Sequence, residues 1–548
     1  MFETLPILFS AALAAAPLTD RTAEAGIRFS HFNGMIGKHH FPEMMGAGVG
    51  LLDYDRDGDL DLYLVQGALL DPAHQLEDVL IKPEGPLLDR LYRNEGNLKF
   101  VDVTDEAKIA GTGYGMGVSV ADLNNDGWPD LYLSNFGPNQ LWLNQGDGTF
   151  TDATSEWGAG DDRWTVTAVA FDYDRDGWQD LYLVNYVDYA IKGAKVCRSH
   201  SDLPDYCSPQ SYKPSSDRLL RNQAGAKFQQ VTGRAGMSAA GPGLGAVAGD
   251  FNGDGWPDLY VANDGAANFL WLNQRDGRFI DDALLAGVAV NMAGMAEASM
   301  GVDAGDFDGD GDLDLFMTHL DRQTNTLYEN DGQGWFLDKT LGTVLGSTSF
   351  AYTGFGTGWF DLDNDGWLDL ISANGAVVDI AEQKAAGVVL PLRQRNQLWR
   401  NRGDGRYEDL SGTAGEPFRR ARVSRGAAFG DVDNDGDVDV VLTNNAGPAE
   451  LLINESSNKN SWIGLVPRTA GGAVALGTQV RLQVDGRTLV RRSRTDGSYV
   501  SAHDPRILIG LGSHRGPVAA ELRWPDGRTQ RIEGLAINQY HELTPPAP

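Results

Sequence analysis

The sequence predicts an all-β fold: a seven-bladed β-propeller followed by a small β-sandwich-like domain. Three observations lead to this prediction. An acidic nine-residue pattern recurs seven times between Asp53 and Asp439. A run of alternating apolar residues, typical of a half-buried strand, comes after each copy. The 68 glycines among 548 residues indicate many turns and few long helices.

Each copy of the acidic pattern begins with aspartate and has glycine at its sixth position. Glycine permits the positive φ that folds such a loop back on itself. The copies read DYDRDGDLDL from Asp53, DLNNDGWPDL from Asp122, DYDRDGWQDL from Asp172, DFNGDGWPDL from Asp250, DFDGDGDLDL from Asp306, DLDNDGWLDL from Asp361 and DVDNDGDVDV from Asp431.

A hard divalent cation explains this spacing. Calcium binds about six to eight oxygen atoms, which positions 1, 3, 5 and 9 of a tight turn supply as side chains and position 7 as a carbonyl. Without a cation, carboxylates this close repel one another. We therefore predict about seven structural Ca²⁺ sites; the alternative is a set of acidic surface turns. The expected ligands are Asp53, Asp55, Asp57, Asp59, Asp61, Asp122, Asn124, Asp126, Trp128, Asp130, Asp172, Asp174, Asp176, Trp178, Asp180, Asp250, Asn252, Asp254, Trp256, Asp258, Asp306, Asp308, Asp310, Asp312, Asp314, Asp361, Asp363, Asp365, Trp367, Asp369, Asp431, Asp433, Asp435, Asp437 and Asp439.

An EF-hand loop begins in the same way but needs glutamate at its twelfth position. The first four copies have Leu64, Leu133, Leu183 and Val261 there. The residues after each loop alternate with period two, so the loops are expected to join two strands and not two helices.

Four predicted strands accompany every loop, as the second copy illustrates. GVSVAD leads into the loop, DLYLSN leaves it, and NQLWLNQ and TFTDAT lie on either side of a GDG turn. Four antiparallel strands repeated seven times describe the blades of a propeller. A solenoid is the alternative, but it would need polar capping repeats, which the sequence does not show.

The ring is expected to close through the N-terminus. The seventh copy lacks a fourth strand, and residues Leu18 to Thr22 resemble one. We predict that this segment pairs with Ala449–Asn454, which removes two open sheet edges.

Charge and the N-terminal residues restrict the class of protein. A formal net charge of −31 disfavours nucleic acid, whose phosphates would be repelled. The apolar run from Leu5 to Ala16 ends in small residues, as in a secretory signal peptide, although Glu3 precedes it without any Lys or Arg. A disordered start is the alternative. The run is too short to span a bilayer, and no other segment is suited to do so. We expect an exported protein, periplasmic or extracellular.

The two cysteines, Cys197 and Cys207, lie in a polar segment. In an exported protein, a close pair in an irregular loop predicts a disulfide. Two cysteines with only His200 nearby cannot form a zinc site unaided.

The repeats resemble FG-GAP/VCBS calcium-loop blades, as in integrin α-subunit heads. The segment FPEMMGAGVGLLDYDRDGDLDLYLVQG and the YCSP insert are similar to bacterial relatives of cartilage acidic protein. In the tail, GTQVRLQVDG, SYVSAHDPRILIGLGS and ELRWPDGRTQRI resemble the ASPIC/UnbV domain. The resemblance covers nearly the whole mature chain and implies a secreted calcium-binding or adhesion-like protein, with some relatives accompanying natural-product biosynthesis. The turn NQAGAKF of the third blade departs from the family's acidic GDG without touching the metal loop.

We divide the chain into a signal peptide at 1–16, a propeller at 17–454, a linker at 455–460 and an ASPIC/UnbV-like β domain at 461–548. The last domain contains two predicted hairpins, turning at Asp485-Gly486 and at Pro525 to Gly527. Its arginines, such as Arg491, Arg492 and Arg494, either dock on the acidic propeller or form a solvated face. We favour the solvated face.

The rim opposite the metal loops is expected to carry the long inserts at 66–89, 186–217 and 375–395. The strand after each loop ends there in a polar residue, which either lines a ligand-binding funnel or simply suits the turn; we favour the turn. These residues are Gln66, Asn135, Asn185, Asn263, His319, Asn374 and Asn444. A segment with His39, His40 and Glu43 should reach the same mouth, unless it is an ordinary polar loop.

The tryptophans at position 7 are expected to cover the gaps between blades and not to bind sugars.

The sequence contains no G-x-S-x-G, H-E-x-x-H or P-loop motif. We therefore favour a calcium-stabilised binding module for an unknown protein, carbohydrate or small-molecule ligand. The alternative is a biosynthetic enzyme, cyclase-like or lyase-like, at the metal-free mouth. His319, His40 and Glu43 would then transfer protons.

Overall fold

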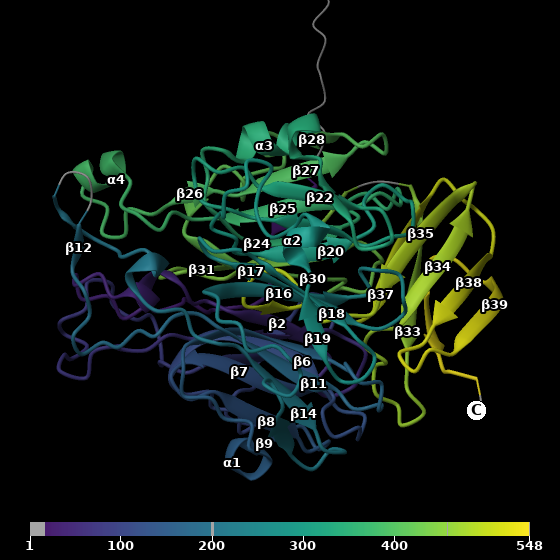
Figure 1. Cartoon of the computed structure of the whole chain (residues 1–548), viewed down its shortest axis with the longest axis horizontal. Helices are drawn as coiled ribbons and strands as arrows, with labels where there is room; N and C mark the ends of the chain where they lie inside the picture. Colours follow the sequence, from purple (N-terminus) through teal and green to yellow (C-terminus); the bar gives the residue numbers. More distant parts are fainter. Residues whose placement is uncertain (1–16, 199–201, 457–458, 547–548) are drawn as a thin grey trace, which may run out of the picture.

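The computed structural model describes residues 17–198, 202–456 and 459–546. The predicted signal peptide at 1–16 and part of the predicted linker lie outside the described residues. Within these ranges, seven sheets form a ring, each with four antiparallel strands and the first with β36 (Ser501–Ala502) added in parallel, and the two C-terminal sheets lie on one side of the ring (Figure 1). The chain is all-β, and its short helices lie only in connections.

Each blade starts with an inner strand that leads into an acidic loop. From the inner strand outward, the blades are β2 Val49–Leu52, β3 Asp61–Leu64, β4 Arg90–Asn94, β5 Phe100–Asp102; β6 Tyr114–Ala121, β7 Asp130–Phe136, β8 Gln140–Asn144, β9 Phe150–Asp152; β10 Thr165–Phe171, β11 Asp180–Asn185, β14 Arg218–Asn222, β15 Phe228–Gln230; β16 Gly243–Gly249, β17 Asp258–Asn263, β18 Phe269–Asn273, β19 Phe279–Asp281; β20 Val302–Gly305, β21 Asp314–Met317, β22 Thr326–Asn330, β23 Phe336–Asp338; β24 Gly354–Phe360, β25 Asp369–Asn374, β27 Gln397–Asn401, β28 Tyr407–Asp409; and β30 Ser424–Gly430, β31 Asp439–Asn444, β32 Glu450–Asn454, β1 Leu18–Asp20.

The ring is closed at its centre and at its outer edge. Inner strands contact one another in chain order from β2 to β30, and β30 contacts β2. At the outer edge, Leu18 lies opposite Asn454 and Asp20 opposite Leu452. This pairing confirms the predicted closure by the N-terminal strand. Between blades, apolar side chains of facing sheets pack together; Tyr63 of the first blade and Val118 and Leu131 of the second belong to one buried cluster.

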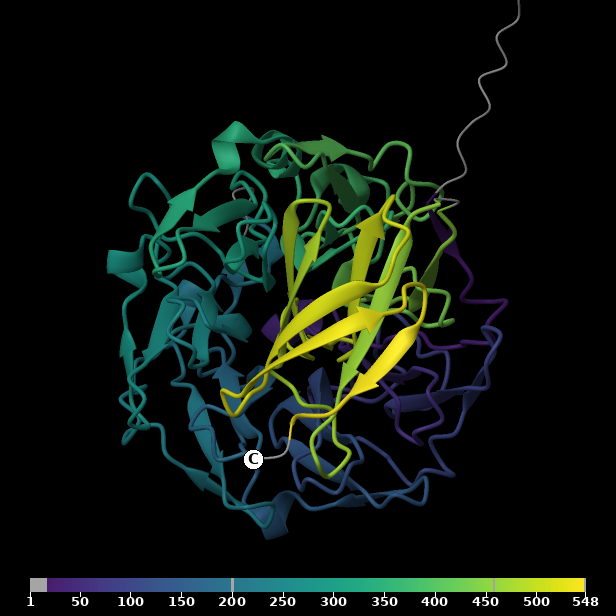
Figure 2. The ribbon, with the colours of Figure 1, turned by 90° about the vertical axis from the view of Figure 1, so that its right-hand side faces the viewer.

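The C-terminal region forms two sheets around its own apolar core. One contains β33 Ser461–Pro467, β37 Ile507–Gly512 and β40 Tyr540–Leu543; the other contains β34 Gln479–Val484, β35 Arg487–Arg492, β38 Val518–Arg523 and β39 Thr529–Leu535. Both predicted hairpins are confirmed, since β34 pairs with β35 and β38 with β39. Figure 2 shows these strands lying over one face of the ring.

A segment of the C-terminal region enters the channel of the propeller. Residues 493–506, here called the axial segment, leave β35 and return to β37. Within it, β36 Ser501–Ala502 pairs in parallel with β2, and Ser498 forms a bridge to Val302 of β20. Inner-strand glycines make room for it: a Cβ on Gly48 would lie 2.8 Å from the Val500 carbonyl oxygen, and one on Gly117 would lie 3.0 Å from the Val500 Cα.

The remaining elements are short and lie in connections. They are β12 Cys197–Arg198 paired with β13 Pro204–Asp205, β26 Gln394–Arg395 paired with β29 Ala421–Arg422, α1 Thr154–Trp157, α2 Ala283–Ala286, α3 Val344–Ser349, α4 Ala381–Ala385, η1 Phe41–Met44, η2 Pro209–Ser211 and η3 Thr340–Gly342. Figure 1 places β12 and α4 on the side of the ring away from the C-terminal sheets. Of the described helices, none has the length and apolar character needed to cross a membrane.

Candidate metal centres

The seven acidic loops share one backbone conformation. The glycine at position 6 has positive φ in every copy, from 87° at Gly177 to 103° at Gly311. Position 4 is also left-handed in every copy, which the sequence reasoning missed. The residues there are Arg56, Asn125, Arg175, Gly253, Gly309, Asn364 and Asn434. Two left-handed residues in six curl the backbone so that alternate side chains face the centre of the loop.

Carboxylate oxygens converge in five of the loops. In each of these, three aspartates place one oxygen apiece within 4.8 Å of one another. The groups are Asp53, Asp55 and Asp57; Asp172, Asp174 and Asp180; Asp306, Asp308 and Asp314; Asp361, Asp363 and Asp365; and Asp431, Asp433 and Asp439. The other two loops have Asn124 or Asn252 at position 3, so an amide replaces one of the three acids.

Six loops contain a buried carboxylate oxygen that has no hydrogen-bond partner among the described residues. These oxygens belong to position 1 or 3, and they are Asp53 Oδ1, Asp55 Oδ1, Asp174 Oδ1, Asp250 Oδ1, Asp306 Oδ2, Asp363 Oδ1 and Asp433 Oδ1. Buried polar atoms are nearly always paired, so each orphan oxygen needs an explanation such as an ion or water. The second loop is the exception, and there the Asn124 amide donates to Asp126 at 2.8 Å. The converging carboxylate oxygens of the loops fit a calcium ion, which binds oxygen ligands.

Burial raises the pKa of these acids in the metal-free protein. It raises the pKa of Asp53 to about 6, and the nearby Asp57 and Asp55 add to the effect. Burial also raises the pKa of Asp61 to about 9 and that of Asp258 to about 8. Each loop therefore resists carrying its full negative charge until a cation compensates it.

The aspartate at position 9 has a second task, which the sequence reasoning also missed. In the fourth blade, one oxygen of Asp258 accepts from the Phe251 N–H at 3.1 Å, and the other accepts from the Asn273 N–H at 2.8 Å. The same two bonds occur in every blade. This carboxylate therefore ties the loop to the third strand.

The asparagine at the end of each third strand links neighbouring blades. Asn273 Nδ2 donates to the Tyr173 carbonyl in the loop of the preceding blade at 2.8 Å. Equivalent bonds of 2.8 to 3.0 Å come from Asn94, Asn144, Asn222, Asn330, Asn401 and Asn454. All seven side chains are buried. Asn94 donates to Val432 of the last blade, so the seven bonds form a closed ring. The sequence already contained this feature, because each third strand ends in an asparagine.

Arginines surround the loops and include those of the C-terminal sheets. Arg494 pairs with buried Asp303 at 2.7 Å, Arg523 with Asp250 at 3.0 Å, and Arg491 donates to the Gly366 carbonyl at 3.1 Å. The preferred solvated face is therefore wrong: Arg491 and Arg523 dock on the acidic rim, and Arg494 of the axial segment pairs with Asp303 on the inner strand β20. Burial lowers the pKa of Arg491 and Arg492, and nearby acids such as Asp306 and Asp496 oppose this shift.

Two of the tryptophans at position 7, Trp128 and Trp256, contact the loop of the neighbouring blade, as expected. The Arg56 guanidinium of the first loop stacks on Trp128 of the second at 5.3 Å, and that of Arg175 stacks on Trp256 at 4.5 Å. These cation–π contacts connect consecutive loops.

On the opposite rim, the polar residues that end each second strand are buried and bonded within the protein. Gln66 donates to Ser30, and the asparagines donate to carbonyls of the next loop along the chain. The bonds join Asn135 to Pro138, Asn185 to Ser216, Asn263 to Ala267, Asn374 to Arg395 and Asn444 to Pro448. Their ligand-binding role stays a prediction.

His319 differs from these amides. It is 1% exposed, and neither ring nitrogen has a hydrogen-bond partner within the described residues. Burial lowers its pKa to about 4. The Nε2 atom lies 3.9 Å from Glu297 Oε2.

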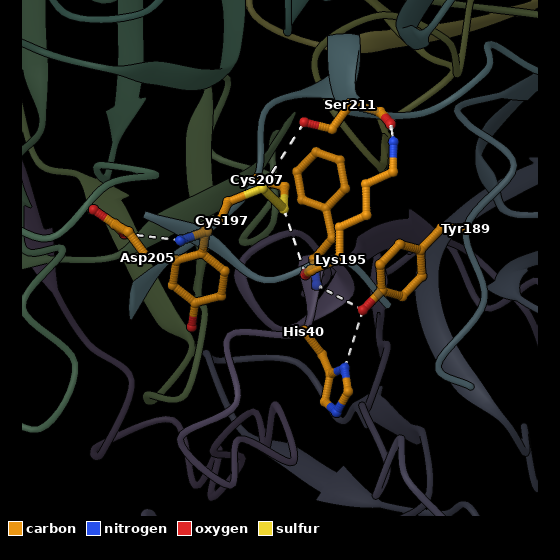
Figure 3. The surroundings of a disulfide bond; sticks show 9 residues. His40, Tyr189, Lys195, Cys197, Asp205, Cys207 and Ser211 are labelled. Carbon is orange, nitrogen blue, oxygen red and sulfur yellow. Dashed lines mark hydrogen bonds between the residues drawn. A yellow bond between two sulfur atoms is a disulfide. The ribbon is translucent and has the colours of Figure 1, made fainter. Parts of the chain in front are cut away.

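The segment before the first inner strand reaches the same mouth. Phe41 packs among Trp164, Tyr186 and Tyr189, and His40 Nδ1 lies 3.0 Å from the Tyr189 hydroxyl (Figure 3). Glu43 is fully buried and accepts from the Tyr206 hydroxyl at 3.3 Å; burial raises its pKa to about 8. The catalytic role considered for Glu43, His40 and His319 stays a prediction.

The predicted disulfide is present. Cys197 and Cys207 are bonded, and the insert they cross-link packs against the His40 segment (Figure 3). The Lys195 ammonium group lies over the Tyr212 ring at 5.3 Å and donates to the Ser211 carbonyl. This insert is therefore anchored by a covalent bond, aromatic packing and a cation–π contact.

The protein families that match this chain agree with this architecture. The FG-GAP-like repeat family matches residues 53–133, 122–183, 250–317, 306–372 and 388–475, together more than half of the chain, and the ASPIC and UnbV family matches residues 469–548. Cartilage acidic protein 1 from Mus musculus is 27% identical over 58% of this chain, and the Homo sapiens protein is 26% identical over 58%. The chain spans about half the length of these relatives, 48% and 46%. Among solved structures, YCF48 bound to D1 peptide aligns with 81% of this chain and 99% of its own at 9% identity, with a TM-score of 0.41.

Proposed function

Because this chain belongs to the FG-GAP-like repeat family and ends in an ASPIC and UnbV domain, we propose that it is an exported binding protein whose propeller is held rigid by calcium. The observation that carries the calcium part is the set of buried, unpartnered carboxylate oxygens in six of the seven loops, counted within the described residues. The disulfide supports export, because such bonds persist in oxidising compartments.

Calcium would be held by the side chains at positions 1, 3, 5 and 9 and by the carbonyl at position 7. In the first loop these residues are Asp53, Asp55, Asp57, Asp59 and Asp61. The ion supplies positive charge that offsets the repulsion within each loop. Since Asp61, at the start of the second strand, also accepts from Tyr54 of the loop and from Asn94 of the third strand, a filled loop holds these strands in register.

The rim with the three inserts supplies the binding surface in this proposal. The opposite rim is covered by the C-terminal sheets, and the axial segment fills the channel. The inserts expose six large apolar side chains between 42% and 75%, which are Leu76, Leu80, Val196, Leu203, Val378 and Val389. Exposed apolar side chains on the inserts are suited to contacts with a protein partner.

Calcium removal tests the structural part. We expect EGTA to lower the thermal midpoint of the full-length protein and to expose the loops to protease. Binding to native protein alone stabilises it by about 2.7 kcal/mol per site at a hundredfold excess over Kd. An unchanged midpoint and an unchanged cleavage pattern would show that the loops need no ion.

The binding surface has a separate test. The triple variant Leu80→Ser, Val196→Ser, Val389→Ser should abolish capture of a cross-linked partner from the exported protein fraction of the producing cells. The matched control is Leu284→Ser with Leu285→Ser, which removes two exposed apolar groups from α2. Loss of capture in both variants, or in neither, would contradict the assignment to the insert rim.

A further inference from the structure

A group of unpartnered hydrogen-bond donors lies beneath the C-terminal sheets. They border a cavity of about 110 Å³ between these sheets and the last two blades. Arg492, Arg494 and His503 line it from the C-terminal region, and Trp359 and Phe429 line it from the inner strands β24 and β30. These donors are not ligand atoms of the acidic loops.

Arg492 supplies two of the donors. Its Nη1 donates to Asp496 Oδ1 at 3.3 Å, but its Nε and Nη2 are buried without any partner among the described residues. The side chain is 11% exposed. Nε and Nη2 lie on one edge of the planar guanidinium group, the edge that pairs bidentately with carboxylate or phosphate oxygens.

His503 supplies the third donor. The side chain is 3% exposed, and its Nδ1 accepts from the Phe429 N–H at 3.3 Å. A backbone N–H can only donate, so the neutral ring carries its proton on Nε2. Burial lowers the pKa of His503 well below its usual value, and nearby Arg494 and Arg492 lower it further. Nε2 is buried and has no acceptor in the described parts of the chain.

The carboxylates on the cavity wall are already engaged. Both oxygens of Asp504 accept from Arg506, and Asp431 accepts from the Tyr540 hydroxyl at 2.7 Å. Asp361 accepts from two N–H groups of its own loop. Arg494 is paired with Asp303. Among the described residues, none of these carboxylates accepts from Arg492 Nε, Arg492 Nη2 or His503 Nε2.

We propose that this cavity binds a small oxyanion of the size of sulfate or phosphate. One oxygen edge of the anion would accept from Arg492 Nε and Nη2, and another oxygen from His503 Nε2. On this measure one water molecule needs about 10–15 Å³, so a cavity of about 110 Å³ has room for a group larger than a single water. Arg492 ends β35 and His503 belongs to the axial segment, so the anion would connect the C-terminal sheet to the segment in the channel.

Calorimetric titration of the calcium-loaded, full-length protein with sodium sulfate tests the proposal, with sodium chloride of equal ionic strength as the reference. We expect one sulfate site per chain, and a similar site for inorganic phosphate. Arg492→Lys keeps the charge but loses the two-donor edge, so sulfate should bind roughly tenfold more weakly or worse. His503→Phe removes one neutral donor and should weaken binding by a smaller factor, about three- to tenfold.

Arg531→Met is the matched control, because Arg531 is an exposed arginine of the same sheets that pairs only with Glu521 and Glu533 among described residues. It should bind sulfate like the parent protein. Sulfate heats no larger than those of chloride, or unchanged affinity in Arg492→Lys, would overturn the proposal. If the variants fail to fold, crystals of the parent protein soaked in selenate decide: an anomalous peak beside Arg492 and His503 supports the site, and its absence refutes it.

Discussion

The rim of acidic loops and the rim of inserts differ in what holds them together. On the loop rim, buried carboxylates have raised pKa values and unpartnered oxygens, and Arg523 of the C-terminal sheets pairs with one of them, Asp250. On the insert rim, Phe41, Trp164 and Tyr189 pack as a cluster beside the disulfide of Cys197 and Cys207. Charge dominates the first rim and apolar packing the second.

The comparison shows that one ring can be stabilised by bound charge on one rim and by apolar packing on the other. The loop rim depends on the cations and protons in solution, because its charges are not balanced within the protein. The insert rim depends on them less, because apolar burial and a covalent bond carry no charge, although the buried Glu43 there also has a raised pKa. Conditions that change charge should therefore separate the two rims.

The largest expected effect is a reversal of the pH dependence of stability by calcium. Burial raises the pKa of Asp61 to about 9 and that of Asp258 and Asp361 to about 8 in the metal-free protein. The folded state then binds more protons than the unfolded chain, whose aspartates titrate near about 3.9. The free energy of unfolding should fall as pH rises from about 4 to about 8, by about 5 kcal/mol or more, since one pKa unit corresponds to about 1.4 kcal/mol.

With calcium present, the trend should run the other way, because only deprotonated carboxylates bind the ion. Urea unfolding across this pH range, with dialysed and with calcium-loaded protein, measures both curves. If the free energy of unfolding changes with pH in the same way with and without calcium, the loop rim does not depend on cations and protons as proposed.

Tyr499 tests the link between the rims. It belongs to the axial segment, is fully buried, and its ring lies 4.9 Å from Phe355 at the insert side of the channel. Tyr499→Ala should lower the free energy of unfolding by about 3 to 5 kcal/mol, as for other large buried aromatics. The loss should be the same with and without calcium. Tyr499→Phe is the control and should be nearly neutral, because the hydroxyl has no partner in the described structure. A calcium-dependent loss would show that the axial segment depends on the loops.

A smaller effect is expected from the bonds between blades. Asn273→Ala removes the donor to the Tyr173 carbonyl and leaves that carbonyl buried. The free energy of unfolding should fall by about 1 to 3 kcal/mol. Gln274→Ala changes an exposed neighbour and should have almost no effect. Equal losses in the two variants, measured by urea unfolding, would mean that the ring of asparagines does not join the blades.

Local periodicity explains how much of this architecture was predictable. The repeated loops, the closing strand at Leu18, both C-terminal hairpins and the disulfide arise from residues whose spacing or pairing is visible along the chain. The glycine conformation at position 6 is dictated by the turn itself. These features depend on short segments or on one repeated pattern.

Contacts between distant segments were not predictable in the same way. Nothing near Tyr499 indicates that the axial segment enters a channel built from residues hundreds of positions earlier. The number of arginines in the C-terminal domain does not show which acids they meet. The prediction of a solvated face for Arg494 was wrong for this reason, because its partner Asp303 lies far away in the sequence. The sequence shows an asparagine at the end of each third strand, but it does not show that each asparagine donates to a carbonyl of another blade.

Counting bound calcium tests the central claim most directly. Equilibrium dialysis of the full-length protein at neutral pH, followed by metal analysis, should find about seven ions per chain, one for each loop. Asp53→Asn with Asp55→Asn should remove one ion and leave the others. A correctly folded protein that binds no calcium, or a double variant that binds as many ions as the parent, would contradict the account.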